Sequence, residues 1–263
     1  MKKKKIGLAL GSGGAKGLAH IGAMQVLHEH GFVPHVITGS SFGAVVGGLY
    51  CAGVSPTHME EIAKEMHMRS IVDLNLPDKM GWLSGNKSEK VLREVLSKLN
   101  LKETFSECSI PFGCMTTDLL SAKPFAITDG NLVEAIRASV SIPMVFKAVD
   151  WEDKLLVDGG VLTRVPVKLA KKMGADIVIA IDCVGPSKKI SKEDLSNFGE
   201  TYTRYITMND YEISKAEINS ADHVINICQP DVSASNLKSV DKAIQNGRKA
   251  MQKFLKAHPE ILN

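Results

Sequence analysis

The sequence predicts an α/β protein, a three-layer α/β/α fold with a mostly parallel central sheet. Short apolar runs that suit buried strands alternate along the chain with longer segments of helical periodicity. Polar, glycine-rich clusters follow three of these runs, at 11–17, 39–43 and 158–160. Because functional groups gather at the carboxyl ends of parallel strands, we expect the three clusters to share one edge of the sheet.

Each expected element has a local reason. Strands are short apolar or β-branched runs bounded by turn residues, and helices carry apolar residues three and four positions apart. In chain order, strands are expected at 5–10, 36–38, 112–117, 125–127, 154–157, 177–181 and 223–228. Helices are expected at 18–30, 42–52, 57–67, 89–99, 132–139, 167–173, 195–218 and 240–255.

The length of 263 residues suits one large domain or two small ones. We expect a single domain over 1–263, with a motif-bearing core at about 5–186 and a helix–strand–helix extension over 187–263. Hydrophobic residues make up 44% and charged residues 23% of the chain, which excludes wholesale disorder. The composition is that of a globular protein with a full core.

The charge pattern argues against a nucleic-acid partner. The chain has 32 Lys and Arg against 29 Asp and Glu, a net charge of +3. Lys2, Lys3, Lys4 and Lys5 supply +4 of this, so the rest of the chain carries +3 − 4 = −1. The basic balance is therefore a short terminal run rather than a binding face. We expect this run to be solvated, with contact to an anionic lipid as the alternative.

Cysteine usage points to a reducing compartment. The five cysteines are odd in number, form no CxxC and show no metal-ligand spacing with histidine, so we expect buried free thiols and no metal. They are Cys51, Cys108, Cys114, Cys183 and Cys228. We expect a cytoplasmic protein, with peripheral contact to the inner face of the membrane as an extension of that location.

One uncharged window makes a transmembrane helix a rival prediction. Residues 30–59 contain no Asp, Glu, Lys or Arg, and 36–54 is 19 residues long. This stretch also holds five glycines and the break Thr38-Gly39-Ser40-Ser41. A strand, a sharp turn and a small-residue helix suit that pattern better.

The sequence Gly39-Ser40-Ser41-Phe42-Gly43 has the form G-x-S-x-G between an expected strand and an expected helix. In that setting a tight turn exposes the central hydroxyl at the mouth of the sheet, and the flanking glycines let backbone segments approach closely. The helix N-terminus favours the negative charge that develops in acyl transfer. Ser41 is the expected nucleophile and Ser40 the fallback; a capping serine in a plain turn is the alternative.

The cluster Gly11-Ser12-Gly13-Gly14-Ala15-Lys16-Gly17 follows the first expected strand. It does not fit a phosphate loop, because Lys16 precedes Gly17. A dinucleotide fingerprint fails too, since Lys16 takes the place of the last glycine and no acidic residue lies between Glu29 and Glu60. Free N–H groups at the start of a helix suit an oxyanion hole. The alternative is a strand–helix connection that binds nothing.

A serine nucleophile needs a base, and the sequence Asp158-Gly159-Gly160 supplies a carboxylate after a short strand. Of the eight histidines only His223 and His258 follow Asp158, and neither stands in a catalytic-loop setting. The earlier ones are expected on helix surfaces or in loops: His20, His28, His30, His35, His58 and His67. The residues thus predict a Ser–Asp dyad without histidine. Asp118, Asp182 and the Asp129-Gly130 pair are alternatives, and a turn aspartate is the plain interpretation of Asp158.

In these motifs the chain resembles the patatin-like phospholipases, a family of lipid acyl hydrolases, and is closest to the short bacterial members and the catalytic domain of neuropathy target esterase. The family's G-G-G-x-[RK]-G loop, G-x-S-x-G elbow and D-G-[GA] motif correspond to 12–17, 39–43 and 158–160, and 137–143 is also family-like. Ser12 replaces the first loop glycine, and the resemblance is weak beyond residue 187.

The resemblance implies Ser41 as nucleophile, Asp158 as general base and acid, and the N–H groups of Gly13, Gly14 and Ala15 as the oxyanion hole. Gly11, Lys16, Gly17, Gly39, Gly43, Gly159 and Gly160 are implied as supporting motif positions. The implied substrate is a phospholipid or lysophospholipid ester, with no metal and no cofactor. The oligomeric state is left open.

Three rival functions stay open at this point. The first is a catalytically weak regulatory or lipid-binding module, in which the fold persists with its chemistry lost. The second is a transmembrane or membrane-assembly protein, and the third is a nucleotide-dependent enzyme. Residues 59–83 hold Met59, Met66, Met68, Met80, Trp82 and Leu83. The stretch 59–88 is therefore expected to form either an apolar lid over an acyl-chain groove or ordinary core.

Overall fold

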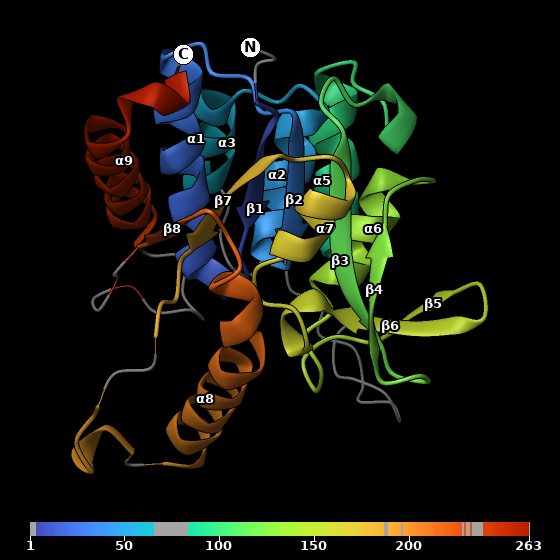
Figure 1. Cartoon of the computed structure of the whole chain (residues 1–263). Helices are drawn as coiled ribbons and strands as arrows, with labels where there is room; N and C mark the ends of the chain where they lie inside the picture. The colour runs from blue at the N-terminus through green and yellow to red at the C-terminus, as the bar shows by residue number, and fades with distance from the viewer. Residues whose placement is uncertain are drawn as a thin grey trace.

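The computed structural model describes residues 4–65, 84–186, 189–195, 197–227, 229, 232 and 239–262. Its centre is an eight-stranded sheet of order β5-β6-β3-β2-β1-β7-β8, with β4 also paired to β3 (Figure 1). The strands are β1 (Ile6–Leu10), β2 (Val36–Ser40), β3 (Phe112–Asp118), β4 (Lys123–Ile127), β5 (Val149–Trp151), β6 (Lys154–Asp158), β7 (Ile177–Asp182) and β8 (His223–Asn226). β3, β2, β1, β7 and β8 are parallel neighbours, whereas β4, β5 and β6 pair antiparallel.

Helices cover both faces of the sheet. They are α1 (Ala19–Glu29), α2 (Phe42–Cys51), α3 (Pro56–Glu65), α5 (Asn86–Lys98), α6 (Leu132–Ser139), α7 (Val167–Lys172), α8 (Phe198–Ile218) and α9 (Val240–Ala257). Alternate side chains of β1 separate the two layers: Leu8 and Leu10 join the core under α1 and α2, and Ala9 joins the core under α7. The three-layer α/β/α prediction is confirmed.

The C-terminal segment packs closely against the first helix. A β-carbon on Gly22 of α1 would lie 1.9 Å from the carbonyl oxygen of Ile244, and one on Gly247 of α9 would lie 1.9 Å from that of Ala19. These two glycines therefore let the α1 and α9 backbones touch. Figure 1 shows α9 against α1. It also shows α8 extending beyond the end of the sheet that lies opposite the two chain termini.

The pairing of β3 explains how two distant segments meet. β2 pairs with β3 as far as Ser40, opposite Met115. β6 pairs with β3 from the other direction, and its last residue, Asp158, lies opposite Thr116. The ends of β2 and β6 therefore meet head to head at consecutive positions of β3, although 117 residues separate Ser41 from Asp158.

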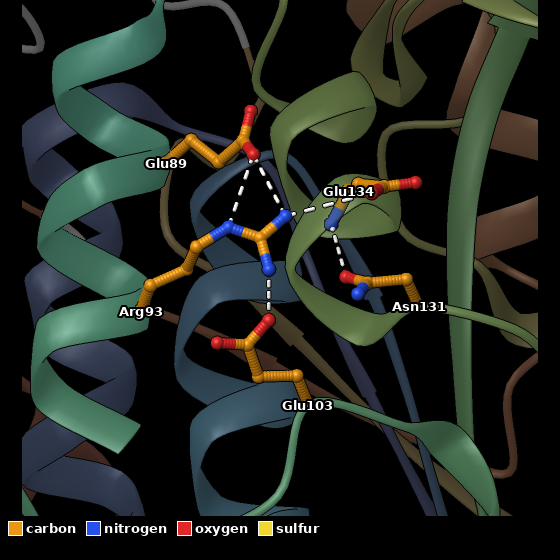
Figure 2. A network of polar contacts seen from close by, with 5 residues as sticks. All are labelled: Glu89, Arg93, Glu103, Asn131 and Glu134. Carbon is orange, nitrogen blue, oxygen red and sulfur yellow. Dashed lines mark hydrogen bonds and ion pairs between the residues drawn. The ribbon is translucent and has the colours of Figure 1, made fainter. Parts of the chain in front are cut away.

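An ion-pair cluster fixes α6, which supports this meeting point, to α5 (Figure 2). Arg93 of α5 donates to Glu89 Oε1 from Nε (3.1 Å) and Nη2 (2.8 Å), and it also contacts Glu103 and Glu134. The side chain of Asn131 caps α6 by accepting from Glu134 N–H at 3.0 Å. The cluster thus joins α5, the segment before a 3₁₀ turn and the start of α6.

The structure departs from the sequence prediction mainly in short elements. β5 was not predicted, because three residues carry no recognisable period. The helix expected from 18 is preceded by a 3₁₀ segment, Gly14–Leu18, and the helix expected from 195 begins at Phe198 after a 3₁₀ turn at Glu193–Leu195. Within the described ranges, none of the helices combines the length and the apolar character needed to cross a bilayer.

Candidate active site

Ser41 occupies a strained turn between β2 and α2. Its φ of 54° and ψ of −125° are unusual for a residue with a side chain, so the surrounding packing must hold the turn. A β-carbon on Gly39 would lie 2.5 Å from Gly43 O, and one on Gly43 would lie 2.2 Å from Leu10 O. The two flanking glycines therefore allow the close backbone approach that the G-x-S-x-G spacing predicts.

Asp158, at the end of β6, is the hydrogen-bond partner of that serine. Ser41 Oγ donates to Asp158 Oδ2 at 2.6 Å, and both residues are only 5% exposed. The other carboxylate oxygen, Oδ1, accepts from Gly160 N–H at 2.7 Å. Burial raises the pKa of Asp158 to about 6, against the opposing effect of these two hydrogen bonds. The carboxylate is thus a stronger base than an exposed aspartate and is still ionised at neutral pH.

The end of α6 supports both members of the pair. Ser41 N–H donates to Ser139 Oγ at 2.9 Å, and that hydroxyl donates to Met115 O at 2.7 Å. Asp158 N–H donates to Ser141 O at 3.0 Å. Arg137, which is 5% exposed, donates to Ser141 Oγ. The family-like segment 137–143 therefore fixes the backbone of Ser41 and of Asp158 at once.

The glycine-rich cluster lies beside the Ser41 turn, and three consecutive N–H groups in it have no acceptor within the part of the chain that the structure describes. Gly11 N–H donates to Ile181 O (3.0 Å) and Ser12 N–H to Arg164 O (2.9 Å). The N–H groups of Gly13, Gly14 and Ala15 make no hydrogen bond to a described residue. Gly13 and Gly14 are half-buried at the start of a 3₁₀ helix. Such an array can accept a developing negative charge.

His20 corrects the expectation that the early histidines lie on helix surfaces or in loops. It is fully buried, and its Nε2 lies 2.7 Å from Gly11 O. Burial lowers its pKa to about 4, so the ring is neutral and Nε2–H donates to that carbonyl. The run Gly17-Leu18-Ala19-His20-Ile21 contains no other polar side chain, a signal that the residue faces the core.

The alternative serine and aspartates lie in other environments. Ser40 is fully buried, and its hydroxyl has no hydrogen-bond partner among the described residues. Asp118 accepts hydrogen bonds from Leu120 N–H, Leu155 N–H and Ser121, which lower its pKa. Asp182 pairs with the buried Arg164 at 2.6 Å. Asp129 is exposed just after β4, at the amino end of β3.

The remaining predicted positions have structural surroundings that fit the motifs. Gly11, Gly17, Gly159 and Gly160 each have a neighbouring atom within 3.0 Å of the place that a β-carbon would take. Lys16 N–H donates to Gly13 O at 3.1 Å and closes the 3₁₀ turn.

His223 and His258 stack edge to face with centroids 4.6 Å apart, at the opposite end of the sheet. In the segments for which coordinates are described, no three His, Cys, Asp or Glu side chains form a group that could hold a metal.

The expectations for the cysteines and for the apolar lid can be followed only in part within the described residues. Cys51, Cys114 and Cys183 are buried free thiols and Cys108 is half-buried; Cys228 lies outside the described residues. Of the expected lid, 66–83 also lies outside them, whereas Met59 is buried in the core on α3. Two hollows of about 510 and 560 Å³ lie at the amino ends of β1, β2 and β3, away from Ser41.

Comparison with known proteins shows the family of the chain. The family model described as Patatin-like phospholipase matches residues 8–171, which contain the 11–17, 39–43 and 158–160 clusters. The chain belongs to the patatin-like phospholipase family. The matched region ends before α8, β8 and α9.

Curated relatives carry names of the neuropathy target esterase group. An uncharacterized NTE family protein of Mycobacterium tuberculosis is 37% identical over 186 residues, 69% of this chain and 49% of the relative. The patatin-like phospholipase domain-containing protein 7 of Mus musculus is 32% identical over 203 residues, 74% of this chain and 14% of that protein. Lysophospholipase nte1 of Aspergillus fumigatus is 27% identical over 212 residues, 77% of this chain and 14% of its own length. The chain thus spans half or less of the curated relatives it matches.

Among solved structures, VipD from Legionella pneumophila aligns with a TM-score of 0.57 at 13% identity, covering 98% of this chain and 67% of that one. At this identity the likeness concerns the fold alone. It extends over the C-terminal segment that the family model leaves out.

Proposed function

We propose that this protein is a serine lipid acyl hydrolase that cleaves carboxylic esters of phospholipids or lysophospholipids. The 2.6 Å hydrogen bond from Ser41 Oγ to the buried carboxylate of Asp158 is the observation that carries the proposal. Membership of the patatin-like phospholipase family and the relative named as a lysophospholipase support the substrate class.

In the first half-reaction, Ser41 Oγ attacks the ester carbonyl carbon while Asp158 Oδ2 accepts the hydroxyl proton. The carbonyl oxygen becomes an oxyanion that the N–H groups of Gly13, Gly14 and Ala15 stabilise. When the tetrahedral intermediate collapses, the ester C–O bond breaks and Asp158 returns the proton to the departing alkoxide. The products are the free alcohol and an acyl ester on Ser41.

In the second half-reaction a water molecule attacks the acyl ester, and Asp158 accepts one proton from it. The second oxyanion occupies the same N–H groups. Its collapse breaks the bond to Ser41 Oγ, which takes the proton back from Asp158. The fatty acid leaves and the starting state is restored. Asp158 therefore acts as base and then as acid in both half-reactions. Gly160 N–H binds its Oδ1, which leaves Oδ2 directed at Ser41 Oγ.

Exposed apolar side chains near this edge of the sheet suit an amphiphilic substrate. Leu119 and Leu120 follow the last residue of β3, and Ile142, Met144 and Val145 follow Ser141, with exposed fractions between 40% and 69%. Single exposed apolar residues are ordinary, but these lie on the two segments that adjoin Asp158. We propose that they contact a lipid surface from which the ester is drawn, as a peripheral membrane contact.

Release of fatty acid from palmitoyl-lysophosphatidylcholine micelles tests the proposal. We expect turnover by the wild type and none above background by Ser41→Ala, which removes the nucleophile without a change in burial. Ser109→Ala, which removes a hydroxyl bonded to Cys51 O on another part of the molecule, is the matched control and keeps its activity. A folded wild type that releases nothing from lysophospholipid, phospholipid or short-chain esters would contradict the proposal and favour a lipid-binding module.

A further inference from the structure

A glutamine from the C-terminal segment reaches the glycine-rich loop beside Ser41. Gln229 is 3% exposed and lies after β8, beyond the region that the family model matches. Its Nε2 donates to Lys16 O at 2.9 Å and to Cys183 O at 3.1 Å. One amide group therefore joins the loop to the segment that follows β7.

The loop is held at its other end by separate contacts. His20 Nε2–H donates to Gly11 O, and Ser12 N–H donates to Arg164 O, so the peptide between Gly11 and Ser12 is fixed on both sides. A second C-terminal residue contributes here, because Ser214 Oγ of α8 accepts from Arg164 N–H at 3.0 Å. The unused N–H groups of 13–15 thus lie between an anchor at 11–12 and the Gln229 anchor at Lys16.

The contacts of Gln229 favour a role in positioning the glycine-rich loop over a role as a residue that only fills the core. Both of its partners among the described residues are carbonyl oxygens, so the NH₂ group must face them and the side-chain oxygen must face away. That oxygen is buried and has no partner among the described residues. A buried amide oxygen without a hydrogen bond is unfavourable, and an apolar side chain of the same size would avoid it. Lys16 O also accepts from Ala19 N–H within its own turn, so what the amide adds is a link from this turn to Cys183 O after β7.

We propose that Gln229 is a positioning residue that sets the oxyanion loop, so that the C-terminal segment completes the active site of the family-matched core. The inference rests on the proposed acyl-hydrolase function. Without Gln229, Lys16 O keeps the hydrogen bond from Ala19 N–H of its own turn but loses its link to Cys183 O, and the N–H groups of Gly13, Gly14 and Ala15 are then less firmly placed. Misaligned donors weaken transition-state stabilisation and leave ground-state substrate binding largely intact.

The test compares two substitutions at buried glutamines in the full chain. Gln229→Met keeps the length of the side chain and removes its donors. Gln25→Met is the matched control, since Gln25 is 6% exposed and its amide contacts Glu60 and Arg248 instead of the loop. Each variant is titrated with a phosphonate probe, and kcat and KM are expressed per reactive site. Hydrogen–deuterium exchange of the peptide covering 11–18 is measured in parallel.

For Gln229→Met we expect kcat to fall about 10- to 100-fold with KM nearly unchanged. The acid limb of the pH profile should stay where it is, because Asp158 is not altered, and exchange in 11–18 should accelerate. Gln25→Met should show neither change. An unchanged kcat per titrated site in Gln229→Met, or an equal loss in Gln25→Met, would overturn the proposal.

A second variant keeps the proposal testable if Gln229→Met does not fold. Gln229→Glu has the same shape but presents a carboxylate to two carbonyl oxygens, and only its protonated form regains a donor. The ratio of its kcat to that of the wild type should therefore rise as the pH falls, and a flat ratio would overturn the proposal. If the wild type neither labels nor turns over, the proposed function fails, while faster or unchanged exchange in 11–18 still decides the role of Gln229.

Discussion

Two clusters of carboxylates in this molecule differ in how their charge is balanced. Around Arg93, three glutamates face one guanidinium on a half-buried surface, and these carboxylates raise the pKa of the arginine (Figure 2). Asp158 is buried with a hydroxyl and an N–H group as partners, and no ion pair to it occurs among the described residues. The first cluster joins helices, whereas the second leaves a carboxylate with a raised pKa beside a strained serine.

A structural cluster therefore differs from a reactive one in how its charge is balanced, and not in whether it contains carboxylates. A carboxylate that is paired with a cation has a lowered pKa, so it stays ionised and is a weak base at neutral pH. An unpaired buried carboxylate is unfavourable to the fold, and that same property makes it a base near neutral pH. Each of the following predictions changes one side of this contrast.

The largest effect is expected for Asp158→Asn. Without the base, kcat/KM at pH 8 should fall about 10³- to 10⁴-fold. Stability should move the opposite way: because the folded pKa of about 6 exceeds the unfolded value of 3.8, the ionised carboxylate destabilises the fold above pH 6. Removing it should raise the free energy of unfolding by about 1–3 kcal/mol at pH 8. Urea unfolding and ester turnover measure the two effects.

The pH dependence of the stability gain in Asp158→Asn serves as its control. It should shrink as the pH falls through 6 and vanish below about 4, where Asp158 is protonated in both folded and unfolded wild type. Asp118→Asn should destabilise the protein at pH 8, because hydrogen bonds from Ser121 and two backbone N–H groups lower the pKa of Asp118. A loss of stability in Asp158→Asn would break the contrast.

The second prediction concerns the pH dependence of the wild type. If Asp158 is the base, kcat/KM should fall about tenfold per pH unit below an apparent pKa of about 6. The acid limb is measured on an uncharged ester substrate, with circular dichroism to show that the chain stays folded over the same range. A rate that holds constant down to pH 4.5 would mean that Asp158 titrates as an ordinary aspartate or is not the base.

The third prediction tests the support of the serine turn. Ser139→Ala leaves Ser41 N–H without its buried acceptor, so we expect a loss of about 1–3 kcal/mol in stability. We also expect kcat to fall about tenfold, since a small displacement of the nucleophile is costly. Ser109→Ala is again the matched control, since it removes a hydroxyl away from the serine turn and should keep the wild-type kcat. Equal kcat values in the two variants would show that Ser139 is only a core residue.

The smallest effect is expected for Arg93→Gln. The arginine side chain is 34% exposed, so solvent and salt screen its ion pairs, and we expect a loss of about 1 kcal/mol or less. Turnover per titrated site should not change. Guanidinium chloride is unsuitable for this comparison because it screens the pairs, so urea unfolding at two salt concentrations is the measurement. A fall in kcat would link the Arg93 cluster to the reaction and remove the contrast.

Local signals in the sequence predicted the serine turn and the layers, but not how the two halves of the candidate site come together. The turn around Ser41 and the order of layers follow from short-range patterns, and both could be predicted. That Asp158 meets Ser41 depends on β2 and β6 ending at adjacent positions of β3, a long-range pairing that no local pattern encodes. The residues alone predicted a Ser–Asp dyad with several candidate aspartates, and the resemblance of the three motifs to a known family singled out Asp158.

Residues that act through packing were the ones missed. His20 is polar and was expected at a surface or in a loop, yet Gly11 O and the thiol of Cys183 lie within hydrogen-bond distance of its ring in the core. Ser139 belonged to a recognised segment without an assigned contact. Gln229 stands apart from every motif, and only the path of the chain after β8 brings it to Lys16.

The central claim is that Ser41, activated by Asp158, forms the covalent intermediate. The most direct measurement is labelling with a fluorophosphonate probe, followed by mass spectrometry of the modified peptide. The account predicts one adduct on Ser41 in the wild type, none in Ser41→Ala, and labelling slowed by orders of magnitude in Asp158→Asn. A folded wild type that stays unlabelled, or an adduct on Ser40 or another serine, would contradict it.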